Sequence, residues 1–150
     1  MSGLDELYQQ IILDHARARH GEGVLDADAA HAERFERNPT CGDEIRLRIT
    51  VDGDRVERIG WEGQGCSISQ ASASIVGQDV PGLTREAAQL RVDAMRRMQR
   101  TRGEHDDADL DLLGDASAFE GVARFPMRVK CAMLPWVALE DTLRQVTARD

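Results

Sequence analysis

The sequence predicts an α+β fold in which a small antiparallel β-sheet packs against helices, and three observations lead to this prediction. A segment of alternating apolar and polar residues is followed by a turn signal and a second apolar segment, as in a β-hairpin. Segments with helical periodicity lie before and after this hairpin. Helices that do not alternate with strands indicate an α+β arrangement rather than a parallel sheet. We find no internal repeat and no linker, so we expect a single domain over residues 1–150.

The first helix is expected over residues 4–19, where LDELYQQIILDHARAR places apolar side chains at helical spacing. Two glycines in HGEGVLD then end the helical pattern. Residues 26–38 are polar with scattered alanines, so we expect a loop there.

A β-hairpin is expected over residues 44–62. EIRLRITV alternates apolar and polar residues, DGD signals a tight turn, and RVERIGWEG predicts a more irregular second strand. Cys41 and Asp43 come just before the first strand, and Cys66 comes just after the second. Because an antiparallel hairpin brings its open ends together, we expect these three side chains to lie close to one another.

Two helices are expected after the hairpin. Residues 63–66 are Gly-rich and predict a loop, and the Ser- and Ala-rich segment at 68–77 predicts a helix. LTREAAQLRVDAMRRMQ, residues 83–99, predicts the next helix, with Thr84 as its N-cap.

The rest of the chain predicts a connector, a short helix or turn, and a long last helix. The acidic segment RGEHDDADLDLLGD, residues 102–115, is expected to be a solvated connector. Residues 117–130 predict a short helix or turn that Pro126 interrupts. The last helix is expected to follow Cys131, with Pro135 in its first turn, where proline is tolerated.

Composition and charge narrow the classes of function. The 150-residue chain is 41% hydrophobic and 31% charged, as in ordinary globular proteins. Its net charge of −8 argues against nucleic acid as a partner, because phosphate contacts require a basic surface. MSGLDELYQQ does not resemble a signal peptide, and no run of about 18 apolar residues occurs. We therefore expect a cytoplasmic protein without a membrane partner.

Four side chains can supply the ligands of one metal ion: Cys41, Asp43, Cys66 and Cys131. Three cysteines in a reducing compartment do not suggest a disulfide framework, whereas a tetrahedral zinc site takes four S, N or O ligands. The alternative is that the cysteines only fill the core, as single free cysteines often do. Their places at the ends of expected strands and helices, two of them in the glycine-flanked loops TCGD and GQGC, favour a metal site.

The histidines receive simpler interpretations. His15 borders the apolar face of the first helix and is interpreted as a structural histidine. His20, His31 and His105 lie in polar segments, where we expect them to be solvated. Arg128 and Lys130 shortly precede the third cysteine, so their positive charge can offset the charge of three thiolates and a carboxylate.

Three long motifs, NPTCGDEIRL, EGQGCSISQASAS and GVARFPMRVKCAMLPWVALE, resemble the SufU branch of the IscU/NifU-N-like iron–sulfur cluster assembly family. LYQQIILDH also looks like that family's first helix, and the similarity runs in order over residues 4–145. Lys130 stands where the IscU scaffold branch has a histidine, and QRTRGEHDDADLDLLGD occupies the place of an insertion typical of SufU. DHARARHGEGVL departs from the family because it lacks the usual Pro-Arg-Asn.

The resemblance implies a SufE/IscU-like fold and a zinc-dependent sulfurtransferase. In this family, sulfur comes from the persulfide of a PLP-dependent cysteine desulfurase of the SufS type. The resemblance implies zinc bound by Cys41, Asp43, Cys66 and Cys131, with Cys41 as the sulfur acceptor and Arg128 assisting docking or release of that thiol.

Three functions stay open at this point. The first is the sulfur carrier, whose downstream acceptor is undetermined, with a Suf scaffold as one candidate. The second is a scaffold that assembles a transient [2Fe–2S] cluster. The third is a protein in which zinc only stabilises the fold.

Overall fold

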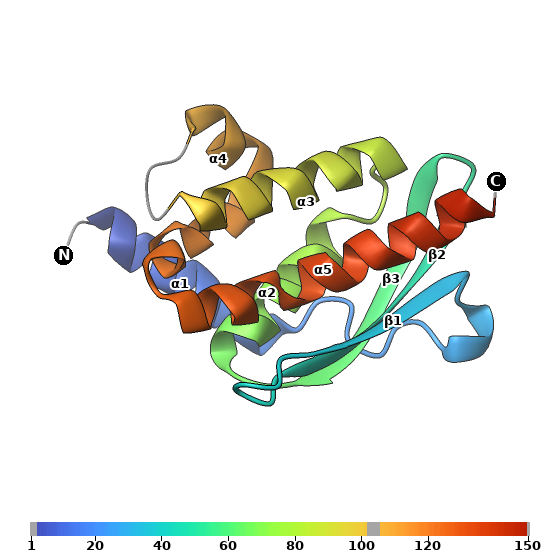
Figure 1. The fold of residues 1–150 in the computed structure, drawn as a ribbon, viewed down its shortest axis with the longest axis horizontal. Helices are drawn as coiled ribbons and strands as arrows, with labels where there is room; N and C mark the ends of the chain where they lie inside the picture. Colours follow the sequence, from blue (N-terminus) through green and yellow to red (C-terminus); the bar gives the residue numbers. More distant parts are fainter. Residues whose placement is uncertain (1–2, 102–105, 150) are drawn as a thin grey trace.

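A three-stranded antiparallel sheet with helices packed against it forms the protein, so the predicted α+β class is confirmed (Figure 1). The computed structural model describes residues 3–101 and 106–149, and the expectation for His105 lies outside them. The elements, in chain order, are α1 (Gly3–Ala18), the 3-10 helix η1 (Ala27–Ala29), β1 (Ala32–Arg37), β2 (Glu44–Asp52), β3 (Arg55–Gln64), α2 (Ser67–Asp79), α3 (Arg85–Arg100), α4 (Asp107–Leu113), the 3-10 helix η2 (Gly114–Arg124) and α5 (Pro126–Ala148).

The predicted hairpin is confirmed and provides two of the three strands. β2 and β3 pair antiparallel, with Glu44 opposite Gln64 at the open end of the hairpin. As alternation predicts, Ile45, Leu47 and Ile49 of β2 are buried in the core, and the strict pattern ends at the register shift between Thr50 and Val51. The open end of the hairpin therefore lies at the edge of the core.

The expectation of a loop over residues 26–38 is wrong for Ala32–Arg37, which form the edge strand β1. β1 pairs antiparallel with β2. Its Glu33 carboxylate accepts hydrogen bonds from Arg46 (2.6 Å) and Arg48 (2.8 Å) of β2. Because backbone pairing and ion pairs hold this strand, hydrophobic alternation does not reveal it.

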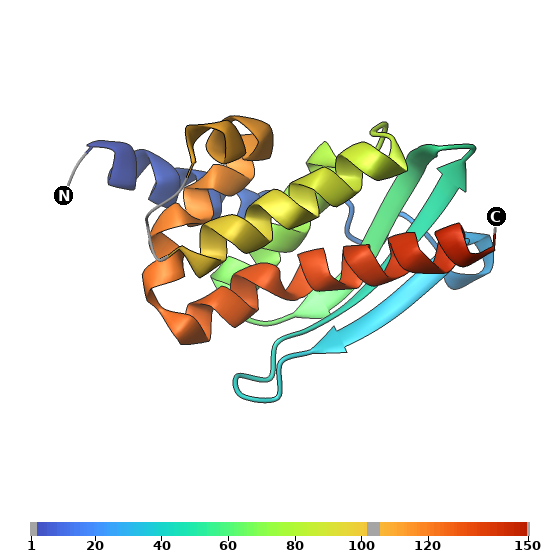
Figure 2. The same ribbon diagram turned by 45° about the horizontal axis from the view of Figure 1, so that its top comes forward.

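The three helices predicted before residue 100 are confirmed as α1, α2 and α3, with small differences at their ends. Thr84 caps α3, since its Oγ1 accepts a hydrogen bond from the Ala87 backbone N–H at 3.0 Å. α1 packs on α2, and α2 contacts β3 and α5. α3 and α5 lie side by side, as Figure 2 shows.

The expectation of an acidic connector is wrong over Asp107–Leu113, which form α4. The Asp106 carboxylate caps this helix by accepting a hydrogen bond from the Ala108 N–H at 3.0 Å. Arg97 of α3 donates two hydrogen bonds, of 2.8 and 3.0 Å, to Asp109. The acidic residues therefore start the helix and join it to α3, in addition to facing solvent.

The last helix begins earlier than expected. Residues 117–130, expected as one short helix or turn that Pro126 interrupts, are divided between two helices: η2 ends at Arg124, and α5 starts at Pro126 itself and already contains Cys131. Proline suits the first helical position because its φ is fixed at a helical value and no N–H is needed there. Pro135 consequently lies inside the helix rather than in its first turn, and it lacks the N–H that would bond the Cys131 carbonyl.

A buried serine joins α2 to α5. The Ser72 hydroxyl donates to the Ala132 carbonyl oxygen at 2.6 Å and accepts from the Trp136 indole N–H at 2.9 Å. Ser72 is fully buried, so both bonds are shielded from water. Because Ala132 directly follows Cys131, this contact fixes the third cysteine relative to α2.

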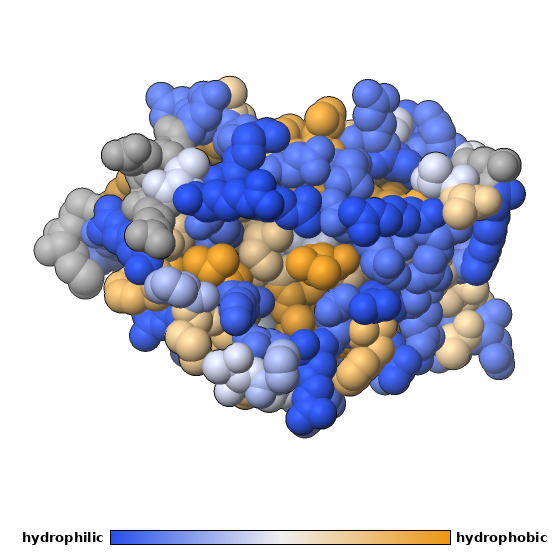
Figure 3. All heavy atoms as spheres, viewed as in Figure 1, coloured by the Kyte–Doolittle hydropathy of each residue, from blue (hydrophilic) through white to orange (hydrophobic). Residues whose placement is uncertain are grey.

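Hydrophilic side chains cover most of one face of the molecule (Figure 3). Figure 3 also shows apolar side chains gathered in a small area over α5. None of the helices among residues 3–101 and 106–149 combines the length and apolar character needed to cross a membrane.

A charged network around Glu140 joins α3 to α5. Glu140 is 8% exposed, and its carboxylate accepts two hydrogen bonds from Arg96, of 2.8 and 3.0 Å. Gln89 and Arg144 donate further hydrogen bonds to it, at 2.9 and 3.2 Å. Hydrogen bonding to Arg96 is the main cause that lowers the pKa of Glu140 from its ordinary value of 4.5. The ionised carboxylate therefore stabilises the folded state.

We predict that Glu140→Gln lowers the free energy of unfolding by about 1–3 kcal/mol at pH 7, because Arg96 loses its charged acceptor. Since the folded-state pKa is depressed, this stabilisation is complete above the unfolded value near 4.5 and is lost as the pH falls through the folded value. Urea unfolding of both proteins between pH 7 and pH 3.5 measures the difference, which should shrink below about pH 4.5. The exposed Glu57→Gln is the control, and a pH-independent difference would contradict the prediction.

Candidate metal centre

The connection between β1 and β2 presents Cys41 and Asp43. Three hydrogen bonds of Asn38 hold this connection in place. The Asn38 backbone N–H donates to the Asp43 carbonyl at 2.8 Å, and the Asn38 carbonyl accepts from the Gly42 N–H at 2.8 Å. The Asn38 side chain accepts from the Thr40 N–H at 3.1 Å. Gly42 has a φ of +75°, in the region that favours glycine. Cys41 is therefore exposed in a defined loop, whereas Asp43 is 2% exposed.

Asp43 and Cys66 meet at the open end of the hairpin. The Cys66 backbone N–H donates to Asp43 Oδ1 at 3.1 Å, and Cys66 Sγ lies 3.5 Å from Asp43 Oδ2. Cys66 is also the N-cap residue of α2, where the helix dipole favours a negative charge. The hairpin thus brings these two side chains together, as its sequence predicts.

Cys131 joins the group from α5. Its Sγ lies 3.5 Å from Cys41 Sγ, and it is the buried member of the three thiols. The ligand atoms of Cys41, Asp43 and Cys131 all lie within 4.8 Å of one another. Cys66 lies at the edge of this group, on the side of Asp43. The structure therefore brings all four candidate ligands to one place.

The donor set and its spacing fit a tetrahedral zinc ion. Zinc binds thiolate at about 2.3 Å and carboxylate oxygen at about 2.0 Å, so ligands that share one ion lie roughly 3.5–3.8 Å apart. The separation of 3.5 Å between Cys41 and Cys131 Sγ, and that of 3.5 Å between Cys66 Sγ and Asp43 Oδ2, are close to these values. Soft thiolates with one carboxylate suit zinc or iron better than magnesium or calcium.

Comparison with known proteins supplies the family. Residues 7–132, which include all four candidate ligands, match the NifU-like N terminal domain. The chain belongs to this family. Within the match lie the loop of Cys41, the hairpin and the first turns of α5, so the family assignment covers the whole candidate centre.

Two curated proteins and one solved structure are similar to this NifU-like chain over nearly its whole length. The chain is 45% identical over 139 residues to the zinc-dependent sulfurtransferase SufU of Bacillus subtilis, covering 93% of this chain and 90% of that protein. It is 37% identical to the iron–sulfur cluster assembly scaffold protein IscU of Streptococcus pyogenes, covering 97% and 87%. A crystal structure of a nitrogen-fixing NifU-like protein (N-terminal) from Brucella abortus has a TM-score of 0.81 at 25% identity, covering 99% and 100%.

The pKa values of two candidate ligands in this NifU-like chain, Cys131 and Asp43, are shifted from their ordinary values. Burial, reinforced by Asp43 and the other two thiols, raises the pKa of the Cys131 thiol far above its ordinary value of 9.0. Burial also acts to raise the pKa of Asp43, but hydrogen bonds from the side chains of Cys131 and Cys41 and from Cys66 outweigh it, so this pKa is lowered. Crowded anions repel one another, and a bound cation relieves that repulsion.

Two small residues beside the candidate ligands, Gly65 and Ser69, were not predicted from the sequence to belong to the site. A Cβ atom at Gly65 would lie 2.4 Å from Asp43 Oδ1 and 2.7 Å from Ser69 Oγ. The buried Ser69 hydroxyl donates to the Cys66 carbonyl at 3.1 Å and lies 3.9 Å from Cys66 Sγ. Glycine at position 65 therefore makes room for the Asp43 carboxylate, and the GQGC motif was the available signal.

The remaining predicted residues lie around the centre. Arg128 is exposed one helical turn before Cys131, with its guanidinium 5.1 Å from the centroid of the Phe125 ring. Lys130 is also exposed, and its ammonium group has no lone pair to offer a metal.

The structural interpretation of His15 is confirmed. This side chain is buried, and its ring nitrogens contact Ser74 Oγ at 3.0 Å and Asp115 Oδ2 at 2.9 Å. His15 therefore joins α1 to α2 and η2. His20 and His31 are exposed, as the sequence predicts.

We predict that Gly65→Ala weakens Zn²⁺ binding by about 10–100-fold, because the added methyl group displaces the Asp43 carboxylate. Competition with a chromophoric zinc chelator measures the affinity. Gly121→Ala is the matched control, since a Cβ at that glycine meets no atom within 4 Å. Equal affinities of the two variants would show that Asp43 does not depend on the space at Gly65.

Proposed function

We propose that this protein is a zinc-dependent sulfur carrier that accepts persulfide sulfur for iron–sulfur cluster assembly. The observation that supports it most is the meeting of Cys41, Asp43, Cys66 and Cys131, with Cys41 exposed on a loop while Cys131 is buried. The 45% identity to a zinc-dependent sulfurtransferase over nearly the whole chain supports the same function.

The four ligands have different roles in this proposal. Bound zinc would keep the thiols deprotonated at neutral pH, the form in which they are nucleophiles. Cys131 and Cys66 belong to or cap helices, so they are the ligands that stay in place. Cys41 lies on the loop between two strands, where it can turn toward solvent without disturbing a helix. Asp43 adds a harder oxygen ligand to the set.

Sulfur transfer then follows ordinary thiol exchange. The Cys41 thiolate attacks the outer sulfur of the donor's persulfide, and the bond between the donor's two sulfurs breaks. The donor's cysteine leaves as a thiolate, and Cys41 carries the new persulfide. No electron is gained or lost overall, so the step needs no oxidant or reductant. Arg128 provides a positive charge at the rim of the centre, where it can attract the incoming anionic group.

The donor in this proposal is a PLP-dependent cysteine desulfurase of the SufS type, and a Suf scaffold is the candidate for the next acceptor. Thiol exchange of this kind suits the reducing cytoplasm. The sulfur would reach Cys41 only when the two proteins dock, because free persulfide sulfur is exposed to competing thiols.

Assembly of a [2Fe–2S] cluster is the second candidate function. Its support is the similarity to proteins described as scaffolds, such as the 37% identical IscU of Streptococcus pyogenes. Three cysteines and one aspartate can also bind iron. Lys130 argues against this function, because the residue directly before Cys131 offers no ligand atom.

We predict that protein purified without added metal contains about one zinc per chain, and that adding it to its cognate desulfurase raises cysteine turnover. Cys41→Ala should abolish the increase while retaining most of the unfolding free energy, because Cys41 lies on an exposed loop. Zinc analysis, alanine production and thermal unfolding measure the three quantities.

The alternatives give different results. Iron with acid-labile sulfide, and transfer of a cluster to an apo-protein, would favour the scaffold. Zinc without any effect on turnover, together with a large loss of stability in Cys41→Ala, would leave only a structural metal ion.

A further inference from the structure

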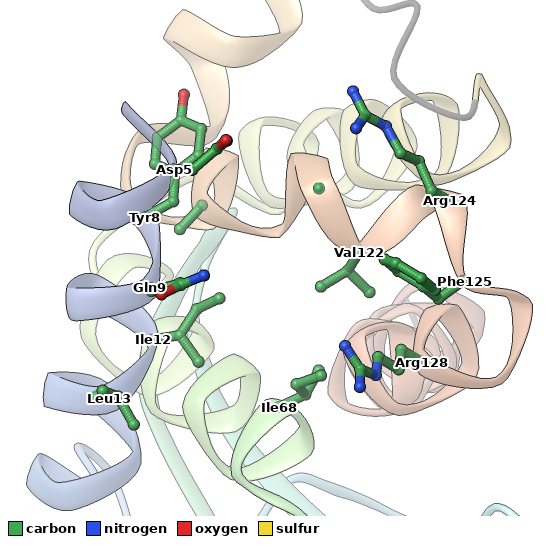
Figure 4. Close-up of a pocket in the computed structure, with 12 residues that line it drawn as sticks. Asp5, Tyr8, Gln9, Ile12, Leu13, Ile68, Val122, Arg124, Phe125 and Arg128 are labelled. Atoms are coloured by element: carbon green, nitrogen blue, oxygen red, sulfur yellow. The ribbon is translucent and has the colours of Figure 1, made fainter. Parts of the chain in front are cut away.

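A groove of about 590 Å³ opens beside the metal centre, between α1, η2 and the start of α5 (Figure 4). Ile12 of α1, Ile68 of α2 and Val122 of η2 point toward its middle and give it an apolar floor. Arg124 and Arg128 stand on the side formed by η2 and α5. A groove with an apolar floor and a few charged groups at its rim is a typical binding site.

The groove adjoins the metal centre. Arg128 lies one helical turn before Cys131, and Ile68 comes two residues after Cys66. A stable protein–protein interface covers about 800 Å² of each partner, far more than the exposed thiols present. Any protein that delivers sulfur to Cys41 must therefore also cover surface next to the centre, and the groove is part of that surface.

Apolar side chains around the groove remain in contact with water. Phe125 is 51% exposed and Leu13 is 44% exposed. Among the described residues of α1, only His15 is buried, so this helix keeps much of its apolar surface free. Exposed apolar surface of this kind marks an interaction site more often than it serves the isolated chain.

Two arginines make the side of the groove formed by η2 and α5 positive, whereas Asp5 lies on the α1 side (Figure 4). Within the described part of the chain, neither Arg124 nor Arg128 forms an ion pair, and the Arg128 guanidinium lies over the Phe125 ring. By contrast, Arg96, Arg97 and Arg144 all pair with carboxylates. Unpaired arginines next to apolar surface complement a carboxylate on a partner.

We propose that this groove is a docking site for the sulfur donor, additional to the metal centre itself. It receives a segment of the desulfurase in which a bulky apolar side chain enters the floor between Ile12 and Val122. A neighbouring carboxylate of that segment pairs with Arg124. The inference rests on the proposed function, because it takes its occupant from the reaction, and it adds α1 and η2 to the surface that the donor recognises.

Two variants test the groove without touching a metal ligand. Gly121→Leu fills it, since Gly121 lines the groove and a Cβ there meets no atom within 4 Å. Arg124→Gln removes one positive charge from the rim. Arg144→Gln is the matched control, because it changes the net charge equally near the other end of α5. Zinc content and thermal unfolding establish that each variant is folded and loaded.

Two measurements with the cognate SufS-type desulfurase decide the matter: direct binding by calorimetry, and desulfurase turnover against the concentration of this protein. We expect Gly121→Leu and Arg124→Gln each to raise the dissociation constant and the half-saturating concentration at least about fivefold, with the maximal turnover kept within about twofold. Arg144→Gln should stay within about twofold of wild type. If Gly121→Leu fails to fold, Arg124→Gln decides alone.

The possible results distinguish failure of the proposed docking site from failure of the proposed sulfur-carrier function. Binding and half-saturation of both groove variants equal to those of Arg144→Gln would overturn the docking site and leave the sulfur carrier intact. Binding that depends on the groove, but without stimulated turnover by wild type, would support the docking site and remove the carrier function. If wild type does not bind the desulfurase at all, both proposals fail.

Discussion

One hydrogen bond, from the Cys66 backbone N–H to Asp43 Oδ1, ties together the parts on which the site depends. It connects the residue directly before β2 with the second residue after β3, so it closes the open end of the hairpin. With Oδ1 engaged in this way, Oδ2 is left to face the thiols. Gly65 makes this possible, because any side chain there would occupy the place of the carboxylate. The part of the candidate metal centre formed by Asp43 and Cys66 is therefore an extension of strand pairing.

The third cysteine is positioned by a different set of contacts. Ser72 links α2 to α5 on both sides of the helical turn that follows Cys131, through the Ala132 carbonyl and the Trp136 indole. α2 begins directly after Cys66, so the same helix relates two of the thiols to each other. Rigid helices thus carry Cys66 and Cys131, whereas Cys41 lies on the loop. This difference in support suits the proposed function, in which Cys41 would leave the metal ion and return to it.

The sequence contained most of the fold and the four candidate ligands, because hydrophobic periodicity, turn residues and helix caps are local signals. It did not reveal β1, whose Glu33 is held by arginines of the neighbouring strand rather than by burial. The start of α5 at Pro126 was not predicted either, because a proline is compatible with the start or the end of a helix until the packing of α5 is known. The contact between Gly65 and Asp43 and the groove beside Arg124 depend on close approach between distant segments; the GQGC motif indicates small residues there but not what they approach.

The four candidate ligands come from three separate pieces of chain: the loop before β2, the start of α2 and the second turn of α5. An ion bound to all of them acts as a cross-link between the hairpin and the helical layer, closing loops that an unfolded chain would leave open. Exchange of one ligand during sulfur transfer would open one arm of that cross-link while two helix-borne thiols keep the layers joined. Chemistry at Cys41 is thereby separated from the cohesion of the fold.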